Sequence, residues 1–165
     1  MSHKYINIYN NLIKLTRNKN LYVKTDNSDS FSDRLAIFLI HFAFFLKIYK
    51  KGNSKKDLQK IYDYNFRQIE LSIREIGYGD ASINGKMKKY LNLFHFILSK
   101  IEIWHKNSIK EKKDFLEDIL NFQSELDYLV EYFDKYIIFL SNNTLNYFSK
   151  DVINHKFYYY GSTKT

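Results

Sequence analysis

Residues 35–46 read LAIFLIHFAFFL and form the most apolar stretch of the chain. Ser30, with Asp33 three residues later, is a typical N-cap pair in front of this stretch, and Gly52 is a typical stop behind it. A helix that crosses a bilayer needs about 20 apolar residues, whereas this stretch has 12 and is interrupted by His41. The stretch therefore predicts a helix that is buried on most of its circumference.

The composition favours helices throughout the chain. Its 165 residues include no proline, no cysteine and five glycines. The absence of cysteine excludes a disulfide scaffold, thiol catalysis and thiolate metal sites, and an apolar content of 45% is too high for a disordered chain. Because turn-rich sandwiches and barrels use many glycines and prolines, the composition indicates an all-α protein.

Apolar residues recur at three- and four-residue steps in further segments. Residues 1–20 are basic and free of acids, as in a mitochondrial presequence, but their apolar stripe favours a structural helix. The predicted helical segments are 3–18, 54–76, 82–104 and 108–140, the last forming one helix or two with a break near 121–123. We predict an all-α fold, a single compact domain of five or six helices over residues 1–148, followed by an aperiodic tail at 149–165.

The charge of the chain is uneven. Lys plus Arg number 26 and Asp plus Glu number 18, which gives a formal net charge of +8. By segment, the net charge is +8 over residues 1–56, +3 over 57–110, −5 over 111–148 and +2 over 149–165. A basic N-terminal part attracts polyanions or anionic lipid headgroups.

Lysine supplies most of this positive charge. The 22 lysines accompany many Asn, Ile, Tyr and Phe residues, a combination typical of AT-rich codon usage. The few arginines are therefore more informative individually than any lysine, and they are Arg17, Arg34, Arg67 and Arg74.

No motif for catalysis or cofactor binding is present. The sequence has no glycine-rich phosphate-binding motif, no zinc-protease motif, no nucleophile elbow and no paired cysteines. The five histidines are scattered and lack the spacing of a metal site. We therefore predict no enzyme activity, no cofactor and no metal. His41 is predicted to be a core histidine bonded to a neighbouring polar group, rather than a catalytic base.

Two blocks of the sequence contain residues that helix packing alone does not require. The first is DSFSDR, from Asp29 to Arg34, which leads into the apolar helix with His41. Arg34 lies in the first turn of that helix, where a cation opposes the helix dipole. We therefore expect Arg34 to have a partner, such as a loop carboxylate or a carbonyl.

The second block is REIGYGD, at residues 74–80. Gly77 fits a left-handed C-terminal cap, where Gly77→Val would destabilise the fold, and Gly79 allows a second unusual backbone angle. Asp80 is expected to bond free N–H groups at the start of the next helix. A capped helix corner explains each of these residues, but it does not explain Arg74 and Glu75.

With these two blocks, the chain resembles the ubiquinol–cytochrome c chaperone family. The resemblance extends over roughly Tyr22–Trp104 and is carried by DSFSDR and by LSIREIGYGDASINGKMKKY at residues 71–90. By position, the residues that match the family blocks, and that the resemblance marks as partner-binding candidates, are Asp29, Arg34, His41, Arg74, Glu75, Gly77, Gly79, Asp80, Lys86 and Lys88.

The resemblance implies a non-enzymatic, all-helical chaperone. Members of the family bind newly made cytochrome b during assembly of ubiquinol–cytochrome c reductase, the respiratory complex III. Mitochondrial members act with a small partner protein and at the ribosome. For this chain we expect a cytoplasmic or matrix-side location, no transmembrane segment, and peripheral contact of the basic N-terminal part with a ribosome or the inner membrane.

Two other interpretations compete with the chaperone. The basic residues 1–56 fit a helical module that binds RNA or ribosomes without a cytochrome client, although no nucleic-acid motif accompanies them. A haem-handling enzyme that uses His41 or His95 is the third interpretation. It predicts a change in the visible haem spectrum that is lost in His41→Ala.

Overall fold

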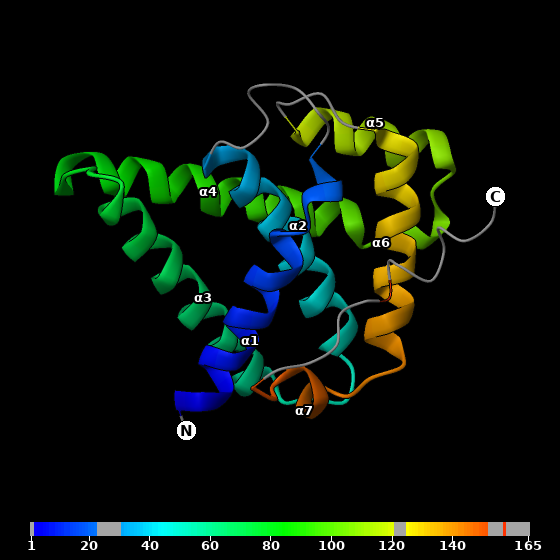
Figure 1. The fold of residues 1–165 in the computed structure, drawn as a ribbon, viewed down its shortest axis with the longest axis horizontal. Helices are drawn as coiled ribbons and strands as arrows, with labels where there is room; N and C mark the ends of the chain where they lie inside the picture. The colour runs from blue at the N-terminus through cyan, green and yellow to red at the C-terminus, as the bar shows by residue number, and fades with distance from the viewer. Residues whose placement is uncertain (1, 23–30, 121–124, 152–156, 158–165) are drawn as a thin grey trace.

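The computed structural model describes residues 2–22, 31–120, 125–151 and 157 (Figure 1). Over this part of the chain all regular structure is helical, which confirms the predicted all-α class. The α-helices are α1 (Ser2–Thr16), α2 (Phe31–Tyr49), α3 (Lys55–Glu75), α4 (Asp80–Ile101), α5 (Ile109–Ile119), α6 (Leu126–Ser141) and α7 (Leu145–Phe148), with short 3-10 helices η1 (Lys19–Leu21) and η2 (Trp104–Lys106).

Helix α2 runs through the middle of the molecule and packs against α1, α4 and α6 (Figure 1). Every residue from Leu35 to Phe45 is buried, as the apolar stretch predicts. A helix that is apolar on all sides gains most when neighbours surround it. The other helices therefore supply one apolar face each and leave a polar face in solvent.

Aromatic rings fill the space between α2 and its neighbours. Phe42 stacks on Phe94 of α4, with 5.3 Å between the ring centroids. Phe44 meets the edge of Trp104 at 5.3 Å and stacks on Phe133 of α6 at 5.6 Å. Such ring pairs add to the free energy gained by burying apolar area, so they hold α4 and α6 against opposite parts of α2.

The helix ends follow the expected capping rules. The Ser54 hydroxyl accepts the backbone N–H of Asp57 at 3.0 Å, and Ser108 forms a complete capping box with Glu111. Gly52, between α2 and α3, has a φ of +84°. These local predictions are confirmed, whereas the N-cap role of Ser30 falls outside the described residues.

The predicted segment 108–140 contains two helices, because α5 ends at Ile119 and α6 begins at Leu126. The expected break at 121–123 itself lies outside the described residues. A further helix, α7, was not predicted, since a single turn is too short to show an apolar period. Its Leu145 and Phe148 are nonetheless buried.

The corner between α3 and α4 is the part of the molecule that projects furthest from α6 (Figure 1). All residues from 74 to 82 are exposed at this corner, while Ile73 and Ile83 on either side of it are buried. The corner therefore carries the REIGYGD block outward on two packed helices. None of the helices in the described part of the chain is both long and apolar enough to span a bilayer.

Candidate functional site

His41 lies at the centre of the core with no exposed surface. Its Nδ1 is 2.8 Å from the carbonyl oxygen of Ile37, and its Nε2 is 2.6 Å from the hydroxyl of Tyr132. Because a carbonyl can only accept, Nδ1 carries the proton and Nε2 accepts the Tyr132 hydroxyl. Burial lowers the pKa of His41 to about 4, so the ring is neutral at pH 7.

This arrangement confirms the prediction of a core histidine bonded to a polar neighbour. Both ring nitrogens are engaged, so His41 presents no free nitrogen to a haem iron. Tyr136, one turn after Tyr132 on α6, donates to the backbone carbonyl of His41 at 3.0 Å. His41 is therefore one of the points where α6 is hydrogen-bonded to α2.

Gly77 ends α3 with a φ of +109°, a backbone angle that side chains with a Cβ rarely adopt. Its N–H donates to the carbonyl of Arg74 at 2.9 Å. The predicted left-handed cap is confirmed. The prediction for Gly79 is wrong, because its φ of −78° and ψ of 169° are ordinary extended backbone.

The prediction that Asp80 caps the next helix is also wrong. Helix α4 begins at Asp80 itself, and its N-cap, Gly79, provides no side-chain hydrogen bond. The Asp80 carboxylate instead forms an ion pair with Arg74 across the corner, and Arg74 also contacts Glu70 at 3.3 Å. The hydrogen bonds that Arg74 donates to Asp80 and, to a lesser extent, to Glu70 raise the pKa of Arg74. Arg74 thus ties the two helices together at their exposed ends.

Two apolar side chains are exposed on this braced corner. Ile76 is 51% exposed and Tyr78 is 41% exposed. The ammonium group of Lys86 lies 4.2 Å from the centroid of the Tyr78 ring, a cation–π contact that orients the ring. Lys88, further along α4, is also exposed. The corner therefore presents a mixed apolar and charged surface.

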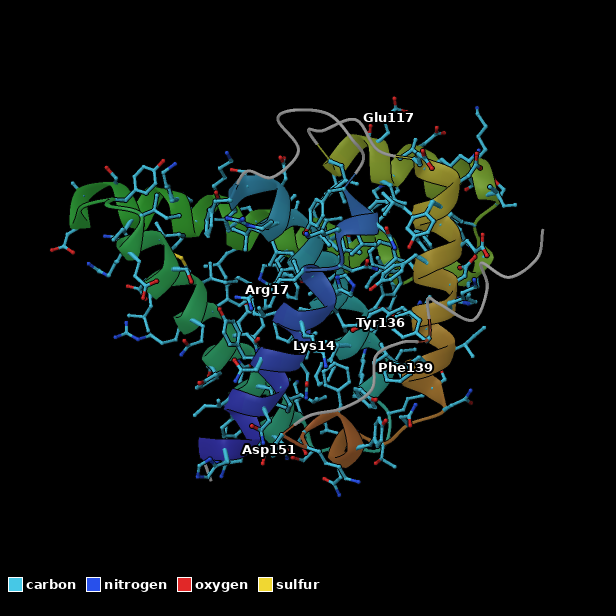
Figure 2. The ribbon with its side chains drawn as sticks, viewed as in Figure 1. Lys14, Arg17, Glu117, Tyr136, Phe139 and Asp151 are labelled. Atoms are coloured by element: carbon cyan, nitrogen blue, oxygen red, sulfur yellow. The ribbon has the colours of Figure 1, made fainter. Side chains whose placement is uncertain are left out.

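A groove of about 1270 Å³ opens between α1, the start of α2 and the end of α3. In Figure 2, Arg17 lies beside the C-terminal part of α1, on the side that faces α3. The groove is lined by apolar side chains and by charged side chains that are exposed. The apolar ones include Tyr9, Ile13, Phe31, Leu35, Phe38, Ile69 and Ile76, and the charged ones are Arg17, Lys19, Arg34, Glu75 and Glu125.

The groove brings together Arg34 of the first sequence block and Glu75 of the second. These two residues are 41 positions apart in the sequence. The groove also includes Arg17, which the sequence marked only as one of four arginines. Burial raises the pKa of Tyr9 at the groove. The charge of Arg17 lowers this pKa, and the charge of Glu75 raises it. Sequence reasoning missed Tyr9 and Ile13 as groove residues, because an apolar stripe alone does not distinguish a groove wall from core.

Other candidates of the two blocks do not line this groove. Arg74, Asp80, Lys86 and Lys88 belong to the corner. His41 lies in the core, and Asp29 falls outside the described residues. Among the residues that the structure describes, no group of three His, Asp or Glu side chains is arranged to hold a metal ion.

The geometry describes an all-helical protein with one open apolar groove beside a braced, exposed helix corner. Residues 24–103 match the family model described as ubiquinol-cytochrome C chaperone, so this part of the chain carries the domain of that family. The match comprises 80 of the 165 residues and contains α2, α3, α4 and the corner. It confirms the resemblance. No curated protein and no solved structure shows significant similarity to the chain.

Proposed function

We propose that this protein is a non-enzymatic assembly chaperone of ubiquinol–cytochrome c reductase, with newly made cytochrome b as its client. The observation that carries the proposal is the family match over residues 24–103. The matched range includes the groove residues Arg34 and Glu75 and the whole α3–α4 corner. A small partner protein and a ribosome remain predicted partners of the same protein.

The groove is the contact surface that we assign to the client. Its volume of about 1270 Å³ exceeds the roughly 300–1,000 Å³ of small-molecule sites. Its lining combines apolar side chains with the exposed charged side chains of Arg17, Arg34 and Glu75. An apolar helix of a membrane protein can bury one face there before it is inserted, while the charged side chains keep the empty groove hydrated.

Deletion of the gene, followed by complementation with variants, tests the proposal. Ile76→Gln changes an exposed groove residue at the C-cap of α3, and Ile138→Gln changes a similarly exposed residue in the last turn of α6, outside the groove. We expect the deletion and Ile76→Gln to lower cytochrome b and complex III activity in membranes. Ile138→Gln is expected to restore both.

Normal cytochrome b and complex III levels in the deletion strain would refute the chaperone role. Equal complementation by Ile76→Gln and Ile138→Gln would leave that role intact, and it would refute the groove as the client surface. Both side chains are more than half exposed, and exposed substitutions change stability by less than about 0.5 kcal/mol. The comparison is therefore not obscured by unfolding.

A further inference from the structure

The ring of Phe157 packs against three aromatic rings of α6. Its centroid is 5.4 Å from that of Tyr132, 5.8 Å from that of Tyr136 and 5.0 Å from that of Phe139. The pairs with Tyr136 and Phe139 are stacked, and Phe157 itself is half-buried. Tyr136 and Phe139 lie on the side of α6 that faces the middle of the molecule (Figure 2). We call Tyr132, Tyr136 and Phe139 the aromatic socket of α6.

Two walls of the socket are held in place from inside the protein. The Tyr132 hydroxyl donates to Nε2 of His41 at 2.6 Å, and the Tyr136 hydroxyl donates to the carbonyl of His41 at 3.0 Å. These hydrogen bonds orient both rings without involving Phe157. The two rings are also nearly parallel, with an interplanar angle of 13°. The socket is therefore preorganised to receive a flat apolar ring.

Phe157 can leave the socket without releasing the residues that precede it. Leu145 and Phe148 of α7 are buried, and the Asn11 amide donates to the carbonyls of Phe148 and Lys150. These contacts hold the chain as far as residue 150, seven positions before Phe157. Full burial of a phenylalanine favours the bound state about ten- to a hundredfold, and a half-buried ring belongs at the lower end. The open socket is thus a populated minor state.

Charge adds a second property to the occupant of the socket. Residues 111–148, which contain α5 and α6, have a net charge of −5, whereas residues 149–165 have a net charge of +2. The carboxylates of Asp127 and Glu131 on α6 are exposed, and the lysines that pair with them are already counted in this sum. A phenylalanine that follows a lysine, as Phe157 follows Lys156 in the sequence, therefore suits both the rings and the charge.

We propose that the aromatic socket is a docking site for another protein that presents a phenylalanine on a basic segment, and that Phe157 fills the site while this partner is absent. Phe157 shows which side chain the socket accepts, and at the same time it blocks the socket. A side chain on the same chain competes at an effective concentration of about 1 mM. The socket lies outside residues 24–103, and the docking does not depend on the client, so it is independent of the proposed function.

The test titrates a labelled synthetic peptide with the sequence of residues 152–165 into the purified full chain. The peptide represents the partner, because it carries the phenylalanine that fits the socket. For the Phe157→Ala variant we expect a dissociation constant of about 100 µM, which is the effective concentration divided by a tenfold preference for the closed state. The wild type should bind the peptide about tenfold more weakly, because its own Phe157 competes.

Two controls separate the ring from the rest of the peptide and the socket from the rest of the protein. A peptide carrying Phe157→Ala should not bind to the Phe157→Ala variant of the protein. Phe96→Ala also removes a phenyl ring, which is 43% exposed on α4 and lies outside the socket. The Phe96→Ala variant should therefore bind the peptide as weakly as the wild type does.

Nuclear magnetic resonance locates the bound peptide and also tests the wild type directly. The amide resonances of Tyr132, Tyr136 and Phe139 should shift when the peptide is added to the Phe157→Ala variant. About 5 mM peptide should shift the same resonances in the wild type, because this concentration exceeds the dissociation constant of about 1 mM expected there. This measurement does not depend on the folding of any variant.

Four results would overturn the proposal. The first is no binding of the peptide to the Phe157→Ala variant, and the second is equal affinity for this variant and the wild type. The third is the absence of shifts at the socket in the wild type. The fourth is a dimeric wild type that Phe157→Ala makes monomeric, which would assign the socket to Phe157 of a second copy. None of these results bears on cytochrome b levels in the deletion strain, so the two proposals fail separately.

Discussion

The Tyr132 hydroxyl lies 2.6 Å from Nε2 of His41, and this hydrogen bond joins residues that are 91 positions apart. Both side chains are buried, and His41 is completely so. A buried acceptor that loses its donor keeps the full cost of having been removed from water. The pair therefore contributes to holding α6 on α2.

We expect Tyr132→Phe to lower the free energy of unfolding by about 1–3 kcal/mol, because Nε2 of His41 is left without this donor. Urea denaturation measures the change. Tyr136→Phe is the comparison: its hydroxyl donates to the backbone carbonyl of His41, and a carbonyl inside a helix also accepts a backbone N–H. A cost for Tyr136→Phe as large as for Tyr132→Phe would contradict the role assigned to Nε2.

Stability should fall as the pH is lowered through the range set by His41. A histidine in the unfolded chain titrates near 6.5, whereas burial lowers the pKa of native His41 to about 4. Between these values the unfolded chain binds a proton that the native protein does not, so unfolding becomes easier. The loss is about 2 kcal/mol between pH 7 and pH 5.

Urea midpoints at the two pH values, measured for the wild type and for His41→Gln, check this dependence. The variant cannot take up the proton, so its midpoint should change much less between pH 7 and pH 5. If both proteins lose the same stability, the pH dependence comes from other groups.

Gly77→Ala should destabilise the protein, whereas Gly79→Ala should not. A Cβ at either position meets no atom within 4 Å, so steric contact does not distinguish them. The backbone does, because Gly77 has a φ of +109° and Gly79 a φ of −78°. We expect a cost of about 1–2 kcal/mol at Gly77, seen as a lower melting temperature. Equal melting of the two variants would contradict the left-handed cap.

Arg74→Ala should impair complex III assembly without unfolding the protein, since we expect the corner to contact a partner. Arg67→Ala is the matched control, because Arg67 also pairs with Glu70 on the exposed face of α3 but lies outside the REIGYGD block. Both variants should melt close to the wild type, because exposed ion pairs contribute little to stability. If complex III assembly falls equally in both variants, or falls in neither, the corner is not the surface that contacts a partner.

Features that depend on neighbours along the chain were predictable from sequence. Ser54, Ser108 and Gly77 act within one helix turn, so their capping roles follow from residue type and spacing. Asp80 shows where this reasoning stops. Its predicted role depended on where α4 begins. Because α4 begins less than one turn from the predicted position, the Asp80 carboxylate pairs with Arg74 instead.

Features that depend on tertiary packing could not be predicted. The sequence identified His41 as a core residue but could not name Tyr132, since the partner depends on how α6 packs on α2. The same holds for the groove. Arg34 and Glu75 were both candidates, but their convergence requires the packing of α1, α2 and α3 that only the structure supplies.

Helix α1 is fastened to the other end of the described chain by two of its asparagines. The Asn11 amide donates to the carbonyls of Phe148 and Lys150, at 2.9 and 3.0 Å, and Asn7 donates to that of Ser149 at 3.0 Å. Asn11 is buried, so its amide has no water to replace these acceptors. Helix α1 therefore cannot complete these hydrogen bonds until residue 150 has left the ribosome. The contact between α1 and the residues that follow α7 should therefore form only after residue 150 has been translated.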